Sequence, residues 1–195
     1  MLTVLSKFIL RLSGWTMLGK KPPEKKYMAI GYPHTANLDA FWVLLTILAM
    51  GERPKVLIKA DFFVFPVKRL LLWVGGVPVV RGKGAGDLVQ QSVDYIKSQE
   101  TVALMLSPEG SRSYTEYWKS GFYHIAKAAQ LPIYFCFLDY GNNTLGINST
   151  PLYLTGNMSA DMEIVRAFYL PKQSRRPDRV GPIRLKGEDP PYEPD

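Results

Sequence analysis

Short apolar runs and longer helical patterns alternate along this chain. Runs rich in β-branched and aromatic residues are typical of strands, and they lie at 27–32, 55–60, 77–81, 101–106 and 132–140. Longer apolar or helically periodic segments predict helices at 38–50, 87–99, 117–130 and 159–170. Strands that alternate with helices favour an α/β fold, here a single-domain mixed sheet flanked by helices over residues 25–170.

Residues 1–20 predict an amphipathic helix. Its apolar positions recur at helical spacing, at Leu2, Leu5, Phe8, Ile9, Leu12 and Trp15. Lys7 and Arg11 interrupt the apolar core that a signal peptide needs, so we expect this segment to remain on the mature protein. The residues alone leave two roles open, a helix packed on its own domain and a helix on a membrane surface. The apolar runs at 41–50 and 70–80 fall short of the roughly 20 residues that cross a bilayer.

Residues 171–195 are rich in proline and charge. They are basic through "KQSRRPDR" and acidic in "GEDPPYEPD". Segments of this composition bury little apolar surface, so we expect a flexible tail here.

The composition narrows the class of partner. A net charge of +7 predicts an anionic partner, such as nucleic acid, an acidic membrane surface or a phosphorylated substrate. Nucleic acid is disfavoured because the basic residues are scattered and the aromatic residues lie in apolar runs. The single cysteine, Cys136, lies in such a run, which excludes a disulfide framework and a cysteine-based zinc site and fits a reducing compartment.

Polar residues that could take part in catalysis or ligand binding follow the predicted strands. His34 and Asp39 come after the first strand, Arg81 ends the third, and Glu109 and Arg112 follow the fourth. In open α/β sheets, ligands bind beyond the carboxyl ends of the strands. We therefore expect these side chains to lie in one site.

His34 and Asp39 could form a catalytic dyad. A carboxylate in the first turn of a helix is favoured there, and it can orient one imidazole nitrogen while the other takes a proton from a hydroxyl. No nucleophile of the protein accompanies the pair, which suits a reaction in which the substrate supplies the attacking oxygen. The alternative is that Thr35, Asn37 or Asp39 caps the helix and His34 is a turn residue.

The segment "SPEGSRS", residues 107–113, has the composition of an anion-binding loop. Arg112 can bind a phosphate through two parallel hydrogen bonds, and backbone N–H groups around Gly110 and Ser111 can add donors. Arg81 is a second cation that could reach the same phosphate. Seen alone, an ordinary loop with a surface salt bridge explains this segment equally well.

Taken in order, four blocks of the sequence resemble the lysophospholipid and glycerol-phosphate acyltransferase family. They are the H-x4-D pattern of His34 and Asp39, "GGVPVVR" ending at Arg81, "PEGSRS" from Pro108, and "LPIYF" from Leu131. The resemblance covers about residues 25 to 140. It implies a glycerol-phosphate acyltransferase-like fold and the activity of an O-acyltransferase in phospholipid biosynthesis.

The resemblance also implies roles for the residues. His34 would be the general base for an acceptor hydroxyl, and Asp39 would orient it. Arg81 and Arg112 would bind the acceptor phosphate. The remaining members of the phosphate pocket would be Glu109, Gly110 and Ser111, with Glu109 ordering an arginine or the acceptor hydroxyl.

The partners implied are a lysophospholipid acceptor, most of all 1-acylglycerol-3-phosphate, and acyl-CoA or acyl-carrier protein as co-substrate. No metal and no other cofactor is expected. Because substrate and product are lipids and the chain is basic, we expect a cytoplasmic protein bound peripherally to the anionic inner face of the cell membrane through residues 1–20. Two alternatives stay open: an O-acyltransferase for another acceptor, such as a lyso-ornithine lipid or a glycolipid, and a non-catalytic basic lipid-binding module.

Overall fold

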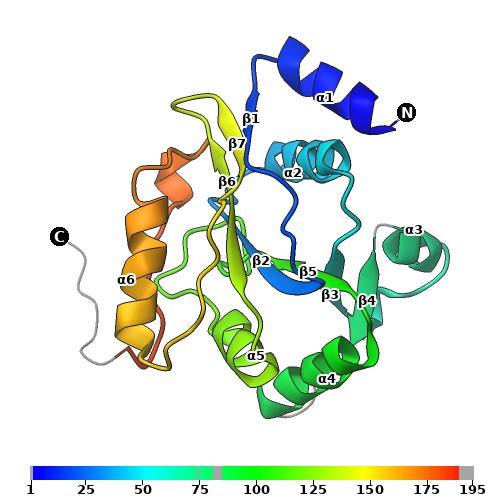
Figure 1. Ribbon diagram of the computed structural model, residues 1–195, viewed down its shortest axis with the longest axis vertical. Helices are drawn as coiled ribbons and strands as arrows, with labels where there is room; N and C mark the ends of the chain where they lie inside the picture. Colours follow the sequence, from blue (N-terminus) through cyan, green and yellow to red (C-terminus); the bar gives the residue numbers. More distant parts are fainter. Residues whose placement is uncertain (1, 74, 81–84, 189–195) are drawn as a thin grey trace.

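The computed structural model describes residues 2–73, 75–80 and 85–188 (Figure 1). They form one seven-stranded sheet in the order β1-β7-β6-β2-β5-β3-β4. The strands are β1 (Thr16–Leu18), β2 (Lys26–Tyr32), β3 (Lys55–Lys59), β4 (Gly76–Val79), β5 (Val102–Leu106), β6 (Ile133–Asp139) and β7 (Thr144–Ile147). Strands β2 to β6 run parallel, and β7 runs antiparallel to β6 and parallel to β1. The mixed α/β sheet that the sequence predicts is confirmed.

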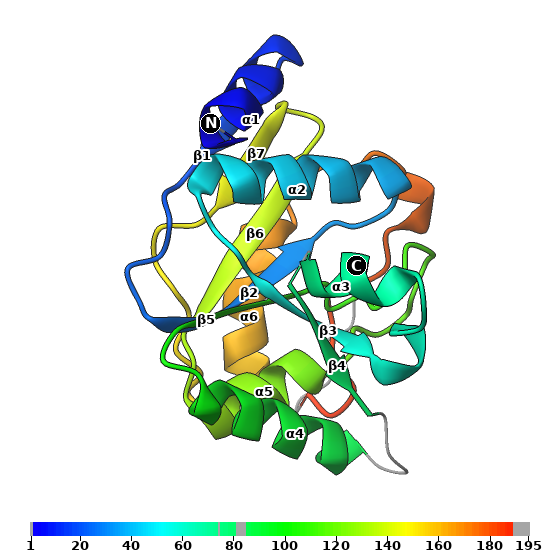
Figure 2. The same cartoon turned by 90° about the vertical axis from the view of Figure 1, so that its right-hand side faces the viewer.

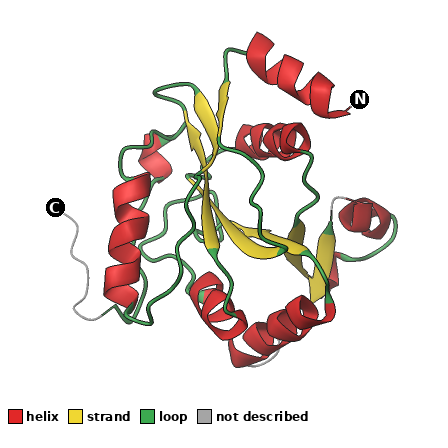
Figure 3. Cartoon of the chain, viewed as in Figure 1, coloured by secondary structure: helices red, strands yellow, loops and turns green. Residues whose placement is uncertain are grey.

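Helices cover both faces of this sheet (Figures 2 and 3). The α-helices are α1 (Leu2–Leu12), α2 (Asn37–Met50), α3 (Val67–Trp73), α4 (Ala85–Ser98), α5 (Gly121–Ala129) and α6 (Met158–Tyr169). Two 3-10 helices, η1 (Ala60–Phe62) and η2 (Pro177–Arg179), complete the described elements. Figure 2 shows α2 on one side of the sheet and α4 and α5 on the other.

The central strand β2 shows why the strands read as continuous apolar runs. Met28, Ile30 and Tyr32 face one side and belong to the large core formed with α5 and α6. Tyr27 and Ala29 face the other side and belong to a smaller cluster. Because a parallel strand in the middle of such a sheet is buried on both faces, its sequence loses the alternation of an edge strand.

The N-terminal helix is shorter than predicted. Periodicity predicts a helix over residues 1–20, but α1 ends at Leu12 and the chain turns at Gly14, whose φ of 80° favours glycine. Trp15 then packs in a cluster that joins α1 and α2, and Thr16–Leu18 pairs with β7 as strand β1. Pairing with a distant strand decides this boundary, and local periodicity does not encode it.

The prediction of a flexible tail is wrong for residues 171–188. Ile183 and Leu185 are buried in the large core, and Leu185 forms a β-bridge with Trp118. The carboxylate of Glu188 lies 2.9 Å from the guanidinium of Arg166, with both side chains almost fully buried. Apolar residues spaced between prolines and charges, together with a buried ion pair, fold this segment onto the domain. The rest of the predicted tail, residues 189–195, lies outside the described residues.

Candidate functional site

The site forms where β2 and β5 end side by side. Ile30 of β2 pairs with Leu106 of β5, so the two chains leave the sheet at the same level. The loop after β2 carries His34, and the loop after β5 carries residues 107–113. The parallel register thus brings together two segments that are more than seventy residues apart, as the hydrogen bond between His34 and Glu109 shows.

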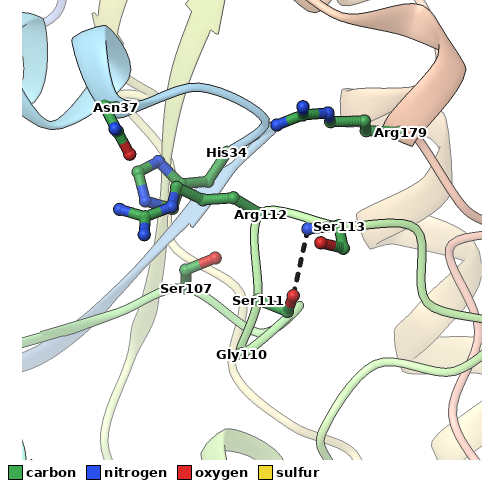
Figure 4. A pocket seen from close by; sticks show the side chains of 8 residues that line it. All are labelled: His34, Asn37, Ser107, Gly110, Ser111, Arg112, Ser113 and Arg179. Carbon is green, nitrogen blue, oxygen red and sulfur yellow. Dashed lines mark hydrogen bonds between the residues drawn. The ribbon is translucent and has the colours of Figure 1, made fainter.

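An open cleft of about 540 Å³ lies between these loops (Figure 4). Its lining residues are His34, Asn37, Ser107, Gly110, Ser111, Arg112, Ser113 and Arg179. Of the predicted site residues, His34, Gly110, Ser111 and Arg112 therefore share one cleft, whereas Asp39 and Glu109 are buried. Arg81 lies outside the described residues.

The carboxylate of Asp39 is held by three hydrogen bonds. Its Oδ2 accepts the backbone N–H groups of Thr35 and Ala36, each at 2.7 Å, and caps the start of α2. Its Oδ1 accepts the hydroxyl of Tyr140 at 2.6 Å. The Nδ1 of His34 lies 3.8 Å from Oδ2, which is longer than a hydrogen bond but close enough for a strong electrostatic interaction. Capping the helix and facing the histidine are thus compatible tasks for one carboxylate.

The imidazole of His34 is partly buried and favours its neutral form. Burial lowers the pKa of His34 below its usual value, and Arg112 lowers it further, while Asp39 raises it in part. A neutral imidazole at neutral pH has a free nitrogen lone pair, which is what a general base requires.

Glu109 has a different partner from the one expected. The resemblance implies that it orders an arginine or a hydroxyl, but its Oε2 accepts the backbone N–H of His34 at 2.8 Å. Burial raises the pKa of Glu109 to about 8, and nearby Asp39 contributes to the rise. Glu109 therefore fixes the backbone of the loop that carries His34. With a pKa of about 8, its carboxyl group is protonated in most molecules at neutral pH.

The loop after β5 presents cationic and hydroxyl groups to the cleft. Gly110 adopts a φ of 65°, and a Cβ there would lie 3.0 Å from Cγ of Lys119, so the turn requires glycine. Ser111 Oγ accepts the backbone N–H of Ser113 at 3.0 Å. In Figure 4 the Arg112 side chain extends past the imidazole of His34. No carboxylate among the described residues lies within ion-pair distance of Arg112, which leaves its charge available to a ligand.

Two site residues escaped the sequence analysis. Tyr140 follows β6, so the same strand-end rule that singled out His34 could have found it. Arg179 lies on η2, in the segment predicted to be a flexible tail, where composition carries no signal of a site. Within the described part of the chain, no three histidine, cysteine or carboxylate side chains are grouped so that they could hold a metal ion.

Comparisons with known proteins agree with this architecture. A family model described as "Acyltransferase" matches residues 20–138, which is more than half of the chain. No curated protein matches the chain by sequence. The crystal structure of the 1-acyl-sn-glycerophosphate (LPA) acyltransferase PlsC from Thermotoga maritima is similar, with a TM-score of 0.58 and 14% sequence identity. That match covers 89% of this chain and 80% of the PlsC chain, and at this identity it shows a shared fold.

Proposed function

This chain belongs to the acyltransferase family, and on that premise we propose its reaction. It moves a fatty acyl group from an acyl thioester, acyl-CoA or acyl-carrier protein, to the free hydroxyl of a lysophospholipid. The acceptor is 1-acylglycerol-3-phosphate and the product is phosphatidic acid. One observation carries this proposal: a partly buried histidine beside a buried carboxylate shares an open cleft with an arginine that pairs with no described carboxylate.

The geometry suggests a direct transfer to the acceptor. Nδ1 of His34 faces Asp39, which leaves Nε2 for the acceptor hydroxyl. As Nε2 takes the hydroxyl proton, the oxygen attacks the thioester carbonyl and forms a tetrahedral intermediate. The carbon–sulfur bond then breaks, and the imidazolium returns the proton to the leaving thiolate. The charge of Asp39 stabilises the imidazolium between these steps.

Arg112 would bind the acceptor phosphate, with the backbone around Gly110 and Ser111 shaping that end of the cleft. Arg81, the last residue of the "GGVPVVR" motif, would add a second cation there. The co-substrate is the acyl thioester, and the chemistry needs neither a metal nor another cofactor.

We place the enzyme at the anionic inner face of the cell membrane, as a peripheral cytoplasmic protein. Among the described residues, no helix is both long and apolar enough to cross a bilayer. Support for a surface position comes from α1, where Leu5, Phe8 and Leu12 are exposed alongside the cations Lys7 and Arg11.

The test is the detection of product by mass spectrometry from purified protein, lysophosphatidic acid and a panel of acyl-CoA donors. We expect phosphatidic acid from the wild type and a loss of about a hundredfold or more in His34→Ala, the size typical of removing a general base. His124→Ala is the matched control, because His124 is exposed on α5 and outside the cleft.

Full activity of His34→Ala would contradict the proposed mechanism. If the wild type makes no product, carrier-protein donors and acceptors such as lyso-ornithine lipids or glycolipids come next. Lipid binding without turnover under every condition would instead favour a non-catalytic lipid-binding module.

A further inference from the structure

One residue that lines the cleft, Arg179, lies outside the part of the chain that the family model matches. The match ends at residue 138, but Arg179 of η2 lines the cleft together with the loop that follows β5. Figure 4 shows the Arg179 side chain reaching from the C-terminal segment toward the loop that carries His34. The packing of residues 171–188 onto the domain makes this position possible.

Thr35, next to His34, anchors the C-terminal segment at the cleft. Nη1 of Arg179 donates to the backbone carbonyl of Thr35 at 3.2 Å. The backbone N–H of Arg176 donates to Oγ1 of Thr35 at 3.3 Å. Thr35 is only 1% exposed. The first bond holds the Arg179 side chain beside the loop that carries His34, and the second holds the backbone at Arg176 there.

Arg179 keeps donors for a ligand. Among the hydrogen bonds within the described part of the chain, Nη1 is the one side-chain nitrogen of Arg179 that is bonded, so Nε and Nη2 retain donor hydrogens. No described carboxylate lies within ion-pair distance of Arg179, whereas the neighbouring Arg176 pairs with Asp178 at 3.1 Å. The half-buried Arg179 and the exposed Arg112 are therefore two arginines on one cleft, and neither forms an ion pair with a described carboxylate.

Two arginines that form no ion pair with a described carboxylate fit an anion with more than one charge. A phosphate monoester carries about −1.5 to −2 charges at neutral pH and has three acceptor oxygens, whereas a phosphodiester carries one charge and has fewer free oxygens. Arginine binds such oxygens through its fixed fork of N–H donors.

We propose that Arg179 binds the acceptor phosphate together with Arg112 and makes the enzyme select lysophospholipids that end in a phosphate monoester. This inference rests on the proposed function and adds a specificity residue from outside the family motifs.

The experiment compares Arg179→Gln with wild type on two acceptors, lysophosphatidic acid and a lysophospholipid with a phosphodiester head group. We expect the KM for lysophosphatidic acid to rise about tenfold or more, and the preference for the monoester to fall by a similar factor. The KM for the acyl donor and the melting temperature should stay unchanged. Arg176→Gln is the matched control, because its exposed side chain pairs with Asp178 and the substitution keeps the backbone bond to Thr35.

An unchanged preference between the two acceptors in Arg179→Gln would overturn the inference. So would a lower kcat with unchanged KM and a lower melting temperature, since that pattern is expected of a residue that only holds Thr35 in place. If the wild type turns over neither lipid, calorimetry with glycerol 3-phosphate tests Arg179 separately. Binding to the wild type that weakens about tenfold in Arg179→Gln supports the site, and equal or absent binding rejects it.

Discussion

At the scale of single residues, the site depends on carboxylates whose surroundings differ. Asp39 accepts three hydrogen bonds, from the backbone N–H groups of Thr35 and Ala36 and from the hydroxyl of Tyr140. Glu109 is also buried but accepts one backbone N–H, from His34, and its pKa rises to about 8. The two acids thus contact one histidine at two places: Asp39 faces the imidazole, and Glu109 accepts the backbone N–H.

Glu109 makes stability depend on pH. Its pKa in the folded protein lies near 8, well above the value of 4.5 for an unperturbed glutamate, so the folded state binds this proton more tightly than the unfolded state. The contribution of Glu109 to the free energy of unfolding is therefore fully present below about pH 4.5 and is lost as the pH rises through about 8. We expect the melting temperature of the wild type to fall relative to Glu109→Gln by roughly 5 °C or more between pH 5 and pH 9.

Thermal unfolding at several pH values measures this difference. Glu100→Gln serves as the control, because Glu100 is a highly exposed glutamate that pairs with Lys25 at the surface. Parallel pH profiles for wild type and Glu109→Gln would show that Glu109 ionises freely in the folded protein.

At the scale of elements, α1 uses its two sides differently. Ser6 and Leu10 are buried against α2, and the short side chain of Ser6 lets the helices approach closely. The opposite side leaves large apolar side chains exposed, at Leu2, Val4, Leu5, Phe8 and Leu12. A monomer in water rarely exposes such a row of apolar residues, and the neighbouring Lys7 and Arg11 suit an anionic lipid surface.

Replacing Leu5 and Phe8 together by glutamine should weaken binding to anionic vesicles by about tenfold or more, since each apolar side chain contributes about 1.5 to 3 kcal/mol when fully buried. Vesicle co-sedimentation measures this effect. The melting temperature should stay close to wild type because both side chains are exposed. Ile164→Gln on α6 is the control for an exposed apolar residue elsewhere, and equal binding by all the proteins would exclude α1 as the lipid contact.

At the scale of the whole molecule, the C-terminal segment closes the domain and completes the cleft. After α6 the chain passes Thr35, contributes Arg179, and returns to bury Ile183 and Leu185 in the large core. Glu188 then reaches Arg166, whose guanidinium also donates to the backbone carbonyl of Ile183. A stability defect at this end of the chain can therefore reach the cleft.

Glu188→Ala should lower the free energy of unfolding by about 3 kcal/mol or more, because it removes the buried carboxylate that pairs with the buried charge of Arg166. Urea unfolding measures the loss. Glu163→Ala is a matched control on the same arginine: Glu163 is 66% exposed, and an exposed ion pair contributes about 1 kcal/mol at most. Equal effects of the two substitutions would contradict the assigned role of Glu188.

The sequence by itself determined the central sheet and picked out residues that the fold brings together at the cleft. Local apolar patterns identify β2, β5 and β6 because parallel strands are buried on both faces, and strand ends identify His34 and Glu109. These features are local: a strand and the residue that follows it can be found without knowledge of the neighbours.

The tertiary structure alone decided the end of α1, the packing of residues 171–188, and the addition of Arg179 to the site. Each of these depends on a partner far away in the chain. β1 forms because it pairs with β7, and the carboxylate of Glu188 can be buried because it pairs with the guanidinium of Arg166. A polar or charged residue carries no local sign of its partner, so only the folded chain shows which arginine neutralises an acid and which one faces the cleft.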